Sequence, residues 1–292
     1  MALKKNKNVT QALSIQSFVS YGHVGNCAVL LPLQLLKCRV VPIPTVVFSN
    51  HTGYGEWSGE ILAPKLVLDL FQGIQKRMDI NQFDFFLTGY LGSLELGRTI
   101  QEVVIEMKKK NAELLFCMDP VMGDIGRGFF VKPELPNFFK QELLPYADII
   151  TPNHFELEYL CNKKIKSVYD AVLECRKLID QGPKIILVTS FIADDLSDKK
   201  LMILAVDSKN AFCLTTPRIN VSLNGTGDLT SALFTLFYFK TKNIKKALQE
   251  SISRVYEMIQ KTHKNNSKEL LLVDYQEVIQ KPSRIFSAVK LK

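Results

Sequence analysis

The sequence lacks several features that mark whole classes of protein. It has no C-x-x-C pair among its six cysteines, no metal-ligand spacing among its four histidines and no G-x-x-x-x-G-K-[ST] motif. These absences argue against a redox or zinc site and exclude a Walker-type nucleotide cradle. No apolar run approaches the ~20 residues of a membrane span, and no signal-peptide pattern follows the first lysines. We therefore expect a protein of the reducing cytoplasm.

Clustered basic charge is also missing, although 37 basic and 29 acidic side chains give a net charge of +8. The densest run, Lys108-Lys109-Lys110, is typical of a solvated helix end. A nucleic-acid groove needs basic residues gathered with aromatic ones, and this sequence has no such cluster. We expect neither nucleic acid nor a membrane as a partner, and only a general attraction for anionic ligands.

The chain does have enough apolar sequence for a large core. Hydrophobic residues make up 47% of its 292 residues and charged residues 23%, a balance that is typical of a globular protein. Neither a linker rich in glycine, serine and proline nor an internal repeat divides the chain. We predict a loose N-terminus at residues 1–9 and a single domain over residues 10–292.

Apolar strand patterns alternate with helical patterns along most of the chain. We predict strands at residues 12–15, 39–45, 83–87, 114–118, 148–151, 185–189, 202–206 and 211–214. We predict helices at residues 26–36, 63–76, 97–110, 155–160, 168–181, 230–239 and 244–263, with only helices after the last strand. Apolar strands that are each followed by a helix indicate an α/β fold with a mainly parallel central sheet and helices on both faces. Such sheets bind ligands beyond the carboxyl ends of their strands, so we expect the site there.

A glycine-rich turn precedes the helix predicted to start at Thr230. It reads Gly225-Thr226-Gly227-Asp228, and its glycines leave backbone N–H groups exposed at a helix N-terminus, where anions bind. Asp228 either complements the helix dipole or accepts a proton from an attacking hydroxyl, and spacing alone leaves these readings even. Phosphoryl transfer needs both amides and a carboxylate, which favours the second reading.

Other polar groups follow predicted strands. Asp119 and Asp124 are each typical of a turn, but together, in a chain with a phosphate cradle, they suggest Mg²⁺ held through water. Asn153 and Glu156 form a capping-box pattern, which is a sufficient structural reading. Glu156 facing the metal and phosphates is equally compatible with that pattern. The hydroxyls of Thr189-Ser190 either bond a phosphate or end a strand.

Seven segments carry a resemblance to a known family. They are Ser14-Ile15-Gln16-Ser17, Tyr21-Gly22-His23-Val24-Gly25-Asn26, Phe48-Ser49-Asn50-His51-Thr52-Gly53-Tyr54, Thr88-Gly89-Tyr90-Leu91-Gly92-Ser93, Asp119-Pro120-Val121-Met122-Gly123-Asp124, Ile149-Ile150-Thr151-Pro152-Asn153 and Gly225-Thr226-Gly227-Asp228. Together they resemble the pyridoxal kinase family of the ribokinase-like superfamily, from about residue 10 to Ala288. The F-S-N-H-T block is more specific than a lone G-T-G-D.

The resemblance implies a ribokinase-like fold without a lid domain, and ATP-dependent phosphorylation of the 5′-hydroxymethyl group of pyridoxal in vitamin B6 salvage. Pyridoxine and pyridoxamine are further implied vitamers. The resemblance also implies a homodimer that uses Mg²⁺ together with a monovalent cation such as K⁺.

The resemblance also assigns roles to residues that match its motifs. The catalytic turn would be Gly225, Thr226, Gly227 and Asp228, with Asp228 as the base. The vitamer contacts would be Ser17, Val24, Thr52, Gly53, Tyr90 and Asp228. The ATP contacts would be Asp119, Asp124, Thr151, Glu156, Thr189, Ser190, Thr226 and Gly227, and the metal would face Asp119, Asp124 and Glu156 through water.

Two departures and two alternatives accompany the resemblance. Phe18 stands where many members have histidine, which leaves the vitamer preference open. Thr189 stands where some bacterial members have lysine, which indicates a nucleotide pocket like that of eukaryotic members. A hydroxymethylpyrimidine kinase, or another small-alcohol kinase of the superfamily, is the alternative, although the former typically has cysteine at the position of Asp228. A non-catalytic vitamer-binding protein would not need the complete G-T-G-D turn.

Overall fold

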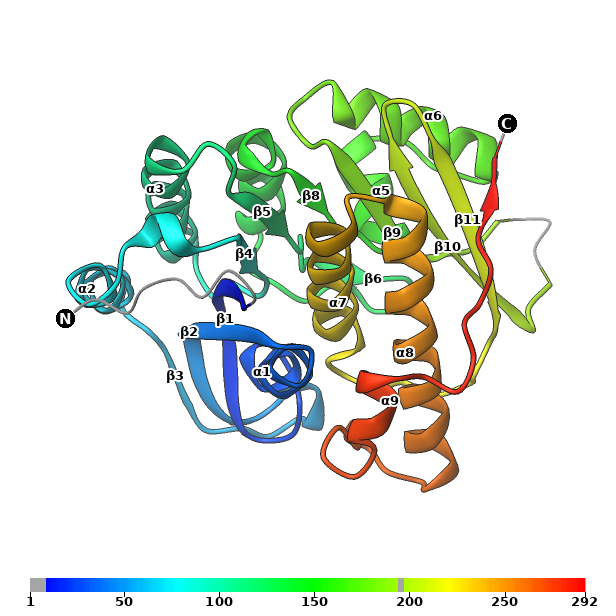
Figure 1. The fold of residues 1–292 in the computed structure, drawn as a ribbon, viewed down its shortest axis with the longest axis horizontal. Helices are drawn as coiled ribbons and strands as arrows, with labels where there is room; N and C mark the ends of the chain where they lie inside the picture. The colour runs from blue at the N-terminus through cyan, green and yellow to red at the C-terminus, as the bar shows by residue number, and fades with distance from the viewer. Residues whose placement is uncertain (1–8, 194–196, 292) are drawn as a thin grey trace.

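The structure, a computed structural model, describes residues 9–193 and 197–291 (Figure 1). Its strands are β1 (Thr10–Tyr21), β2 (Cys38–Asn50), β3 (Gly59–Ile61), β4 (Phe85–Thr88), β5 (Leu115–Met118), β6 (Gly123–Asp124), β7 (Gly128–Phe129), β8 (Ile149–Ile150), β9 (Ile185–Phe191), β10 (Lys200–Asp207), β11 (Ala211–Pro217) and β12 (Val289–Lys290). Its α-helices are α1 (Asn26–Leu35), α2 (Pro64–Gln75), α3 (Leu94–Lys110), α4 (Leu135–Phe138), α5 (His154–Cys161), α6 (Val168–Ile179), α7 (Thr226–Thr241), α8 (Ile244–Lys264) and α9 (Gln276–Gln280). Apart from Val9, the predicted loose N-terminus lies outside the described residues.

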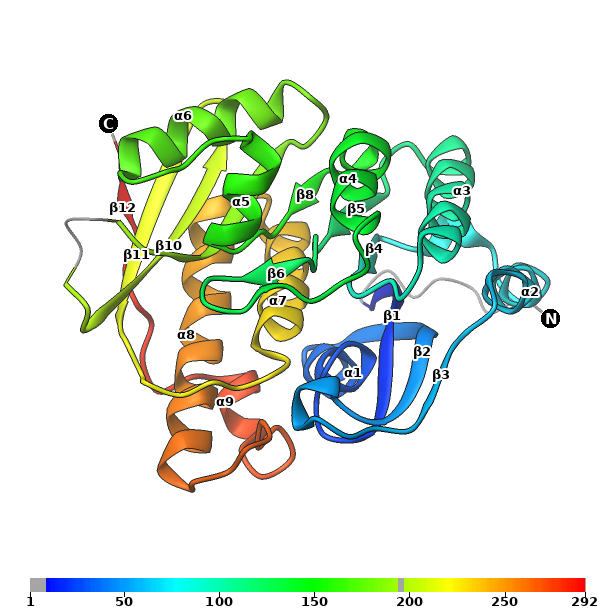
Figure 2. The same cartoon turned by 180° about the vertical axis from the view of Figure 1, so that it is seen from behind.

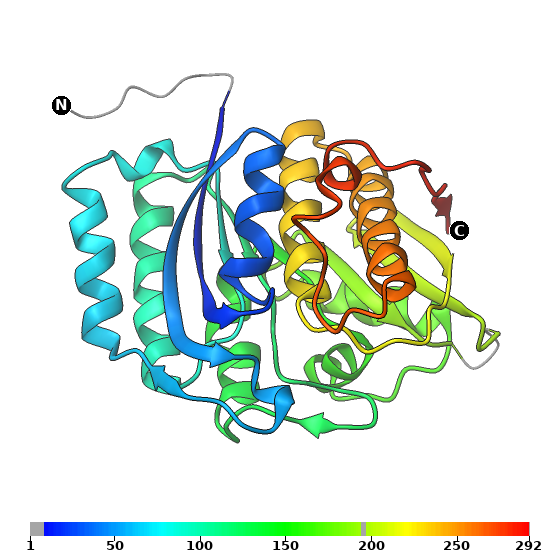
Figure 3. The ribbon, with the colours of Figure 1, turned by 90° about the horizontal axis from the view of Figure 1, so that it is seen from below.

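Ten strands form one sheet in the order β12-β11-β10-β9-β8-β5-β4-β1-β2-β3. All neighbours from β2 across to β9 pair in parallel, whereas β3 at one edge and β10 to β12 at the other pair antiparallel. The prediction of a mainly parallel central sheet is confirmed. Its parallel strands bring their carboxyl ends to one edge, and Figure 3 shows β1 running toward the edge where the green β6–β7 hairpin lies.

Helices cover both faces of this sheet (Figures 1 and 2). On one face α1, α7 and α8 pack through a core that includes Ala28 and Ala232. On the other face α2, α3, α5 and α6 pack through a core that includes Phe71. Successive side chains of a strand point to opposite faces, so Ala12 of β1 joins the first core and Leu13 the second. Burial on both faces explains why the central strands are apolar throughout.

Several predicted boundaries are wrong, and each error has a physical cause. β1 and β2 extend beyond their predicted ends because they pair with each other in parallel from Thr10 to Tyr21. α7 begins at Thr226 rather than Thr230, so the glycine-rich turn forms its first turn. The C-terminus is not wholly helical, because β12 adds an antiparallel strand to β11. The missed strands β3, β6 and β7 have two or three residues each, too few to show a period.

The lysine run, the cysteines and the helix lengths can each be compared with the expectations from the sequence. Lys108 to Lys110 form the last turn of α3, as predicted, and Lys108 Nζ lies 2.7 Å from Asp148 Oδ2. All six cysteines are free. Within residues 9–193 and 197–291, no helix has the length and apolar character that crossing a bilayer requires.

Candidate active site

Two cavities lie at the carboxyl edge of the sheet. The smaller cavity, about 400 Å³, is lined by residues from β1, β2 and the segments after β4, β5 and β8. The larger cavity, about 510 Å³, is lined by residues from β9, β10, β11 and α8. Six residues line both cavities: Asp124, Arg127, Asn153, Thr189, Leu223 and Gly227. The cavities therefore share a wall at the N-terminus of α7.

Every residue that the sequence analysis assigned to the site lines one of these cavities. The smaller cavity contains Ser17, Val24, Thr52, Gly53, Tyr90, Asp119, Thr151, Glu156, Gly225 and Asp228. The larger cavity contains Ser190 and Thr226, and the shared wall contains Asp124, Thr189 and Gly227. The prediction that these residues gather at the carboxyl edge is confirmed. The individual role of each residue stays a prediction.

The glycine-rich turn sits at the start of α7. Gly225 is the N-cap residue and has a φ of 80°, in the left-handed region that favours glycine. A Cβ at Gly225 would also collide with the carbonyl oxygen of His23. The first N–H groups of a helix have no acceptor within the helix, and Gly225 has no side chain to provide one. The amides of Thr226 and Gly227 are therefore placed to bind an anion.

Asp228 points from the first turn of α7 toward the loop between β1 and α1. Its Oδ2 atom accepts a hydrogen bond of 2.9 Å from the N–H of Gly25. Gly25 packs directly on the backbone and hydroxyl of Ser17, where a Cβ could not fit. Burial raises the pKa of Asp228, and the bond from Gly25 opposes this rise. A carboxylate with a raised pKa accepts a proton more readily, as a general base must.

Asp119 lies at the centre of a buried acidic group. It follows β5 and is 7% exposed. The Ser231 hydroxyl lies 3.0 Å from Asp119 Oδ2 and 2.8 Å from Thr151 Oγ1. Burial, followed by the nearby charges of Glu156 and Asp228, raises the pKa of Asp119 well above its usual range. Carboxyl groups crowded in this way are typical of functional sites.

Glu156 closes the capping box predicted from the sequence. Its Oε2 atom accepts the N–H of Asn153 at 2.8 Å, and Asn153 Oδ1 accepts the N–H of Glu156 at 3.0 Å. Glu156 Oε1 also accepts the N–H of Met122 at 2.9 Å, which ties α5 to the segment after β5. Burial raises the pKa of Glu156 to about 7 against these bonds. The structural reading is confirmed, and the same carboxyl lines the smaller cavity.

The predicted metal ligands have the oxygen chemistry that a hard divalent cation prefers. Asp119 and Glu156 are buried beside each other's charge, which a cation would relieve. Across the described ranges, no group of three or more histidine, cysteine, aspartate or glutamate side chains is arranged to hold a metal ion directly. Mg²⁺ usually keeps several waters and binds substrate phosphates with one or two carboxylates, so these residues fit it in that mode.

Thr189 and Ser190 do not end a strand, as one reading of the sequence allowed. β9 continues to Phe191 because it pairs antiparallel with β10, where Phe191 lies opposite Met202. Both hydroxyl residues are half-buried within this strand. The remaining reading, in which the hydroxyls bond a phosphate, is compatible with their place in the larger cavity.

The smaller cavity has an apolar wall beside its polar groups. Val24, Val19, Val46 and Phe48 form a small separate core, and Tyr90 packs against it. Val24 and Tyr90 are the two residues predicted to enclose an aromatic ring. They come from segments far apart in the sequence and meet because β1, β2 and β4 are neighbours in the sheet.

Some residues at the site were not found from the sequence. Gly25 and Ser231 contact the acidic side chains, and Gly25 stands within a segment that carries the resemblance. Arg127 lines both cavities, but no motif or spacing singles it out. Outside both cavity linings, Glu269 follows α8 and accepts hydrogen bonds from Tyr54 Oη at 2.6 Å and the His23 N–H at 2.9 Å, which hold the segments beside Gly53 and Val24. Contacts across 215 and 246 residues leave no local sequence signal.

Comparison with known proteins places this geometry in context. The family model described as phosphomethylpyrimidine kinase matches residues 38–272. The pyridoxal kinase PdxY of Rubrobacter xylanophilus is 41% identical over 271 residues, which cover 92% of this chain and 93% of that protein. The pyridoxal kinase PdxY of Granulibacter bethesdensis is 41% identical over 280 residues, covering 94% of this chain and 98% of that protein.

Solved structures agree with the sequence relatives. Pyridoxal kinase from Leishmania donovani in complex with ADP and pyridoxine superposes with a TM-score of 0.89 at 28% identity, covering 97% of this chain and 99% of that chain. The same kinase in complex with ADP and pyridoxamine gives a TM-score of 0.89 at 27% identity, covering 97% of this chain and 100% of that chain.

Proposed function

The chain belongs to the phosphomethylpyrimidine kinase family and, within it, to the pyridoxal kinases, and from that premise we propose how its two cavities work. The protein transfers the γ-phosphoryl group of ATP to the 5′-hydroxymethyl group of pyridoxal, giving pyridoxal 5′-phosphate. One observation carries this proposal: the two cavities meet at Gly227, beside the amides of α7 and the carboxyl of Asp228. An acceptor and a phosphoryl donor can therefore face each other across that wall.

The smaller cavity is the vitamer site in this proposal. Its wall of Val24 and Tyr90 encloses the pyridine ring, while Ser17 and Thr52 bond the polar edge of the ring. Gly53 belongs to the same turn as Thr52, and its N–H donates a 2.9 Å hydrogen bond to His51 Nδ1. A small aromatic ligand needs this combination of apolar walls and a few placed polar groups. Pyridoxine and pyridoxamine carry the same 5′-hydroxymethyl group and are further acceptors.

The larger cavity is the ATP site. Its apolar lining from β10 and α8 includes Ile203 and Ile252, which suits a nucleobase. Thr189 and Ser190 of β9 face the phosphates, and the amides of Thr226 and Gly227 bind them at the start of α7. The phosphates would then extend from the larger cavity toward the shared wall.

Transfer requires one base and no covalent intermediate. The hydroxymethyl oxygen attacks the γ-phosphorus, the bond from that phosphorus to the bridging oxygen breaks, and Asp228 accepts the hydroxyl proton. The amides of the Gly225 to Asp228 turn stabilise the charge on the moving group. We propose Mg²⁺ as the divalent cation that this kinase family requires; held through water near Asp119, Asp124 and Glu156, it would neutralise phosphate charge. A monovalent cation such as K⁺ is a further proposal by resemblance.

We propose a homodimer formed by the β1–β3 side of the sheet. Large apolar side chains are exposed there: Phe18, Tyr21, Val47, Tyr54 and Trp57. Exposed apolar residues gathered on one side commonly mark an interface. Sedimentation velocity of the purified chain tests the dimer, and a monomer at all concentrations contradicts it.

We also propose that residues 10–292 act as a single cytoplasmic domain, since β1 and β12 belong to the same sheet and the cysteines are free.

The experiment that tests the function compares acceptors. ADP release with ATP and Mg²⁺ is measured for pyridoxal, pyridoxine, pyridoxamine, hydroxymethylpyrimidine and ribose. We expect turnover with the B6 vitamers and none with ribose. Turnover with the pyrimidine alone would favour the second candidate, a hydroxymethylpyrimidine kinase, which the description of the matching family model supports. Vitamer binding without turnover would leave a binding protein.

A further inference from the structure

The β6–β7 hairpin places a guanidinium group at the wall that the two cavities share. Arg127 lies in the turn of this hairpin, between Asp124 of β6 and Gly128 of β7. Among the described residues that line the cavities, it is the one arginine or lysine common to both. Arg218 lines the larger cavity but not the smaller one. Arg127 therefore lies on the wall that separates the proposed phosphoryl donor from the proposed acceptor.

Arg127 is paired with Asp124 in the structure. Its Nε atom lies 3.1 Å and 2.8 Å from the two oxygens of the Asp124 carboxylate, and its Nη2 atom also donates to Oδ2. The two side chains are 55% and 33% exposed. Solvent-exposed ion pairs contribute little to stability, so the guanidinium can exchange this partner at a small cost in free energy.

The base of the hairpin is fixed while its turn is open. Asn153 Nδ2 donates a 2.7 Å hydrogen bond to the Gly123 carbonyl oxygen, and the Phe130 N–H donates a 3.0 Å bond to the Met122 carbonyl oxygen. Within the turn, Gly126 and Gly128 have φ angles of 94° and 71°, and open space surrounds the Cβ position of each. The hairpin is therefore anchored to α5 close to the site, and its turn has room for a side chain to reorient.

The chemistry of the Arg127 guanidinium favours a phosphate as its second partner. Asp119, Glu156 and Asp228 line only the smaller cavity, so Asp124 is the one carboxylate among the described residues of the shared wall. A guanidinium group donates two parallel hydrogen bonds to a phosphate as readily as to a carboxylate. The terminal phosphates of ATP would bring such a partner to the wall on which Arg127 lies.

We propose that Arg127 exchanges Asp124 for the γ-phosphoryl group when ATP binds. In the free protein the guanidinium pairs with Asp124; with ATP bound, its N–H groups donate to the γ-phosphoryl oxygens and the Asp124 carboxylate is released toward the divalent cation. This inference rests on the proposed kinase function. Arg127 is then a catalytic residue that contacts the transferring group, on a hairpin separate from the α7 turn.

The test measures nucleotide binding as well as turnover. Calorimetry compares an ATP analogue with an imido bridge and ADP, both with Mg²⁺, for the wild type, Arg127→Gln and Arg127→Lys. We expect Arg127→Gln to weaken the analogue by about tenfold or more, the loss of a charged hydrogen bond, and ADP by less than about twofold. It should lower kcat for pyridoxal by about 10²-fold. Arg127→Lys should recover part of both losses.

Arg218→Gln is the matched control, because Arg218 lines only the larger cavity. It should change the affinities for the analogue and ADP equally or not at all.

Equal losses of affinity for both nucleotides in Arg127→Gln, or unchanged affinity and kcat, would overturn the inference. A wild type that binds ATP but does not phosphorylate pyridoxal would refute the proposed function, and the difference between analogue and ADP would still test Arg127. Circular dichroism melts confirm folding, and Arg127→Lys carries the test if the glutamine variant fails to fold.

Discussion

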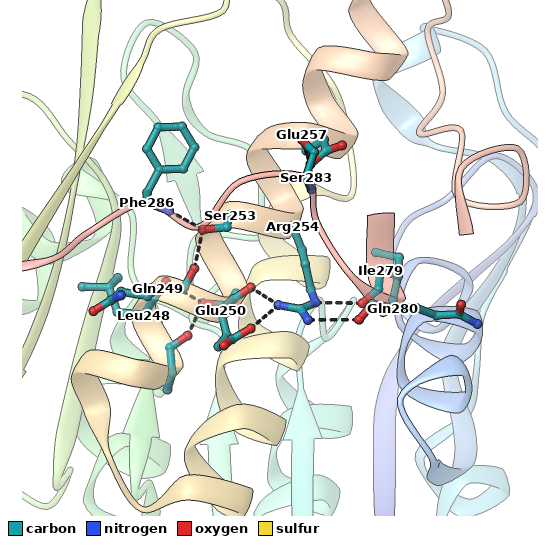
Figure 4. Close-up of polar contacts among 12 residues, drawn as sticks. Leu248, Gln249, Glu250, Ser253, Arg254, Glu257, Ile279, Gln280, Ser283 and Phe286 are labelled. Atoms are coloured by element: carbon teal, nitrogen blue, oxygen red, sulfur yellow. Dashed lines mark hydrogen bonds and ion pairs between the residues drawn. The ribbon is translucent and has the colours of Figure 1, made fainter. Parts of the chain in front are cut away.

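Arg254 and Asp119 are buried to a similar extent but have opposite surroundings. Arg254 of α8 is 5% exposed, and each nitrogen of its guanidinium donates to an acceptor (Figure 4). Its Nε donates to the Ile279 carbonyl oxygen at 2.7 Å, Nη2 to the Gln280 carbonyl oxygen at 3.2 Å, and Nη1 to the Glu250 carboxylate at 2.6 Å. The guanidinium also lies 4.5 Å from the centre of the Phe237 ring. The hydrogen bonds to Ile279 and Gln280 fasten the C-terminal segment to α8.

Asp119 has the contrary environment. Its nearest charged groups, Glu156 and Asp228, carry the same sign, and the Ser231 hydroxyl is a neutral partner. A buried charge without an opposite charge nearby lowers the stability of the fold unless a bound ligand or cation neutralises it. The polar contacts of Arg254 therefore stabilise the fold, whereas the acidic group at the carboxyl edge lowers stability and forms a binding site. The following predictions test this distinction, beginning with the largest expected effect.

Asp228→Asn should abolish most catalysis without harming the fold. Removing a general base typically lowers kcat by about 10² to 10⁴-fold. The free energy of unfolding should stay the same or rise, because a buried negative charge is removed next to Asp119. Steady-state kinetics with pyridoxal and thermal unfolding measure the two effects. Asp69→Asn, on the exposed surface of α2, is the control. An unchanged kcat would refute the role of Asp228.

Arg254→Met should have the opposite profile. Removing the buried guanidinium leaves the Ile279 and Gln280 carbonyl oxygens and the partly exposed Glu250 carboxylate without their partner, which should cost about 3 kcal/mol in the free energy of unfolding. The kcat per folded molecule should remain close to that of the wild type. Urea unfolding and kinetics at a temperature where the variant is folded test this expectation. Arg98→Met, at an exposed pair with Glu142, should cost little. A large loss of kcat in folded Arg254→Met would remove the distinction between the two regions.

The pH dependence of stability should reveal the acidic group. Folded Glu156 keeps its proton up to a pKa of about 7, whereas the unfolded chain loses it near 4.5. Between these values the folded state binds more protons, so the Glu156 carboxyl makes the free energy of unfolding fall as pH rises. The Tm of Glu156→Gln minus that of the wild type should therefore increase across this range without divalent cation. A flat or decreasing difference would contradict the raised pKa.

The comparison with Glu156→Gln is needed because other groups titrate in the same range. Burial lowers the pKa of His23 and of His51, which gives stability that rises with pH. That contribution is common to both proteins and cancels in the difference. The ion-paired Asp148 has a lowered pKa and therefore acts below this range. Adding Mg²⁺ should flatten the wild-type curve if the cation compensates the acidic group.

Asp119→Asn should raise the concentration of Mg²⁺ that half-maximal activity requires, by about tenfold, as expected for a carboxylate that orients metal waters. The KM for pyridoxal should change less, because Asp119 is assigned to the nucleotide side. Titration of Mg²⁺ at saturating pyridoxal, and of pyridoxal at saturating Mg²⁺, separates the two. A larger change in the KM for pyridoxal would place Asp119 on the acceptor side.

Features with a local cause could be predicted from the sequence. The capping box at Asn153 and Glu156 and the glycine-rich turn at the start of α7 each require neighbouring residues only, and both are present. The parallel centre of the sheet followed from the alternation of apolar strands and helices. That Val24 and Tyr90 share a cavity wall could be predicted only from the resemblance, because their spacing in the sequence does not indicate it.

Features with a distant cause could not be predicted. The extra length of β1 and β2 comes from their mutual pairing, and β12 forms because β11 offers a free edge. In the sequence, Arg254 looks like any charged residue of an amphipathic helix. Its burial depends on the carbonyl groups of α9, which are distant in the sequence. Arg127 likewise gains meaning only where the two cavities meet.

The most direct test of the account is a single-turnover measurement of phosphoryl transfer. Enzyme with ATP labelled in the γ-phosphoryl group is mixed with pyridoxal or with its 5′-deoxy analogue, quenched, and the labelled product is identified by mass spectrometry. We predict label on the 5′-oxygen of pyridoxal, none on the analogue, and a rate about 10² to 10⁴-fold lower in Asp228→Asn. Label on the 5′-deoxy analogue, or transfer to pyridoxal that Asp228→Asn leaves unchanged, would contradict the account.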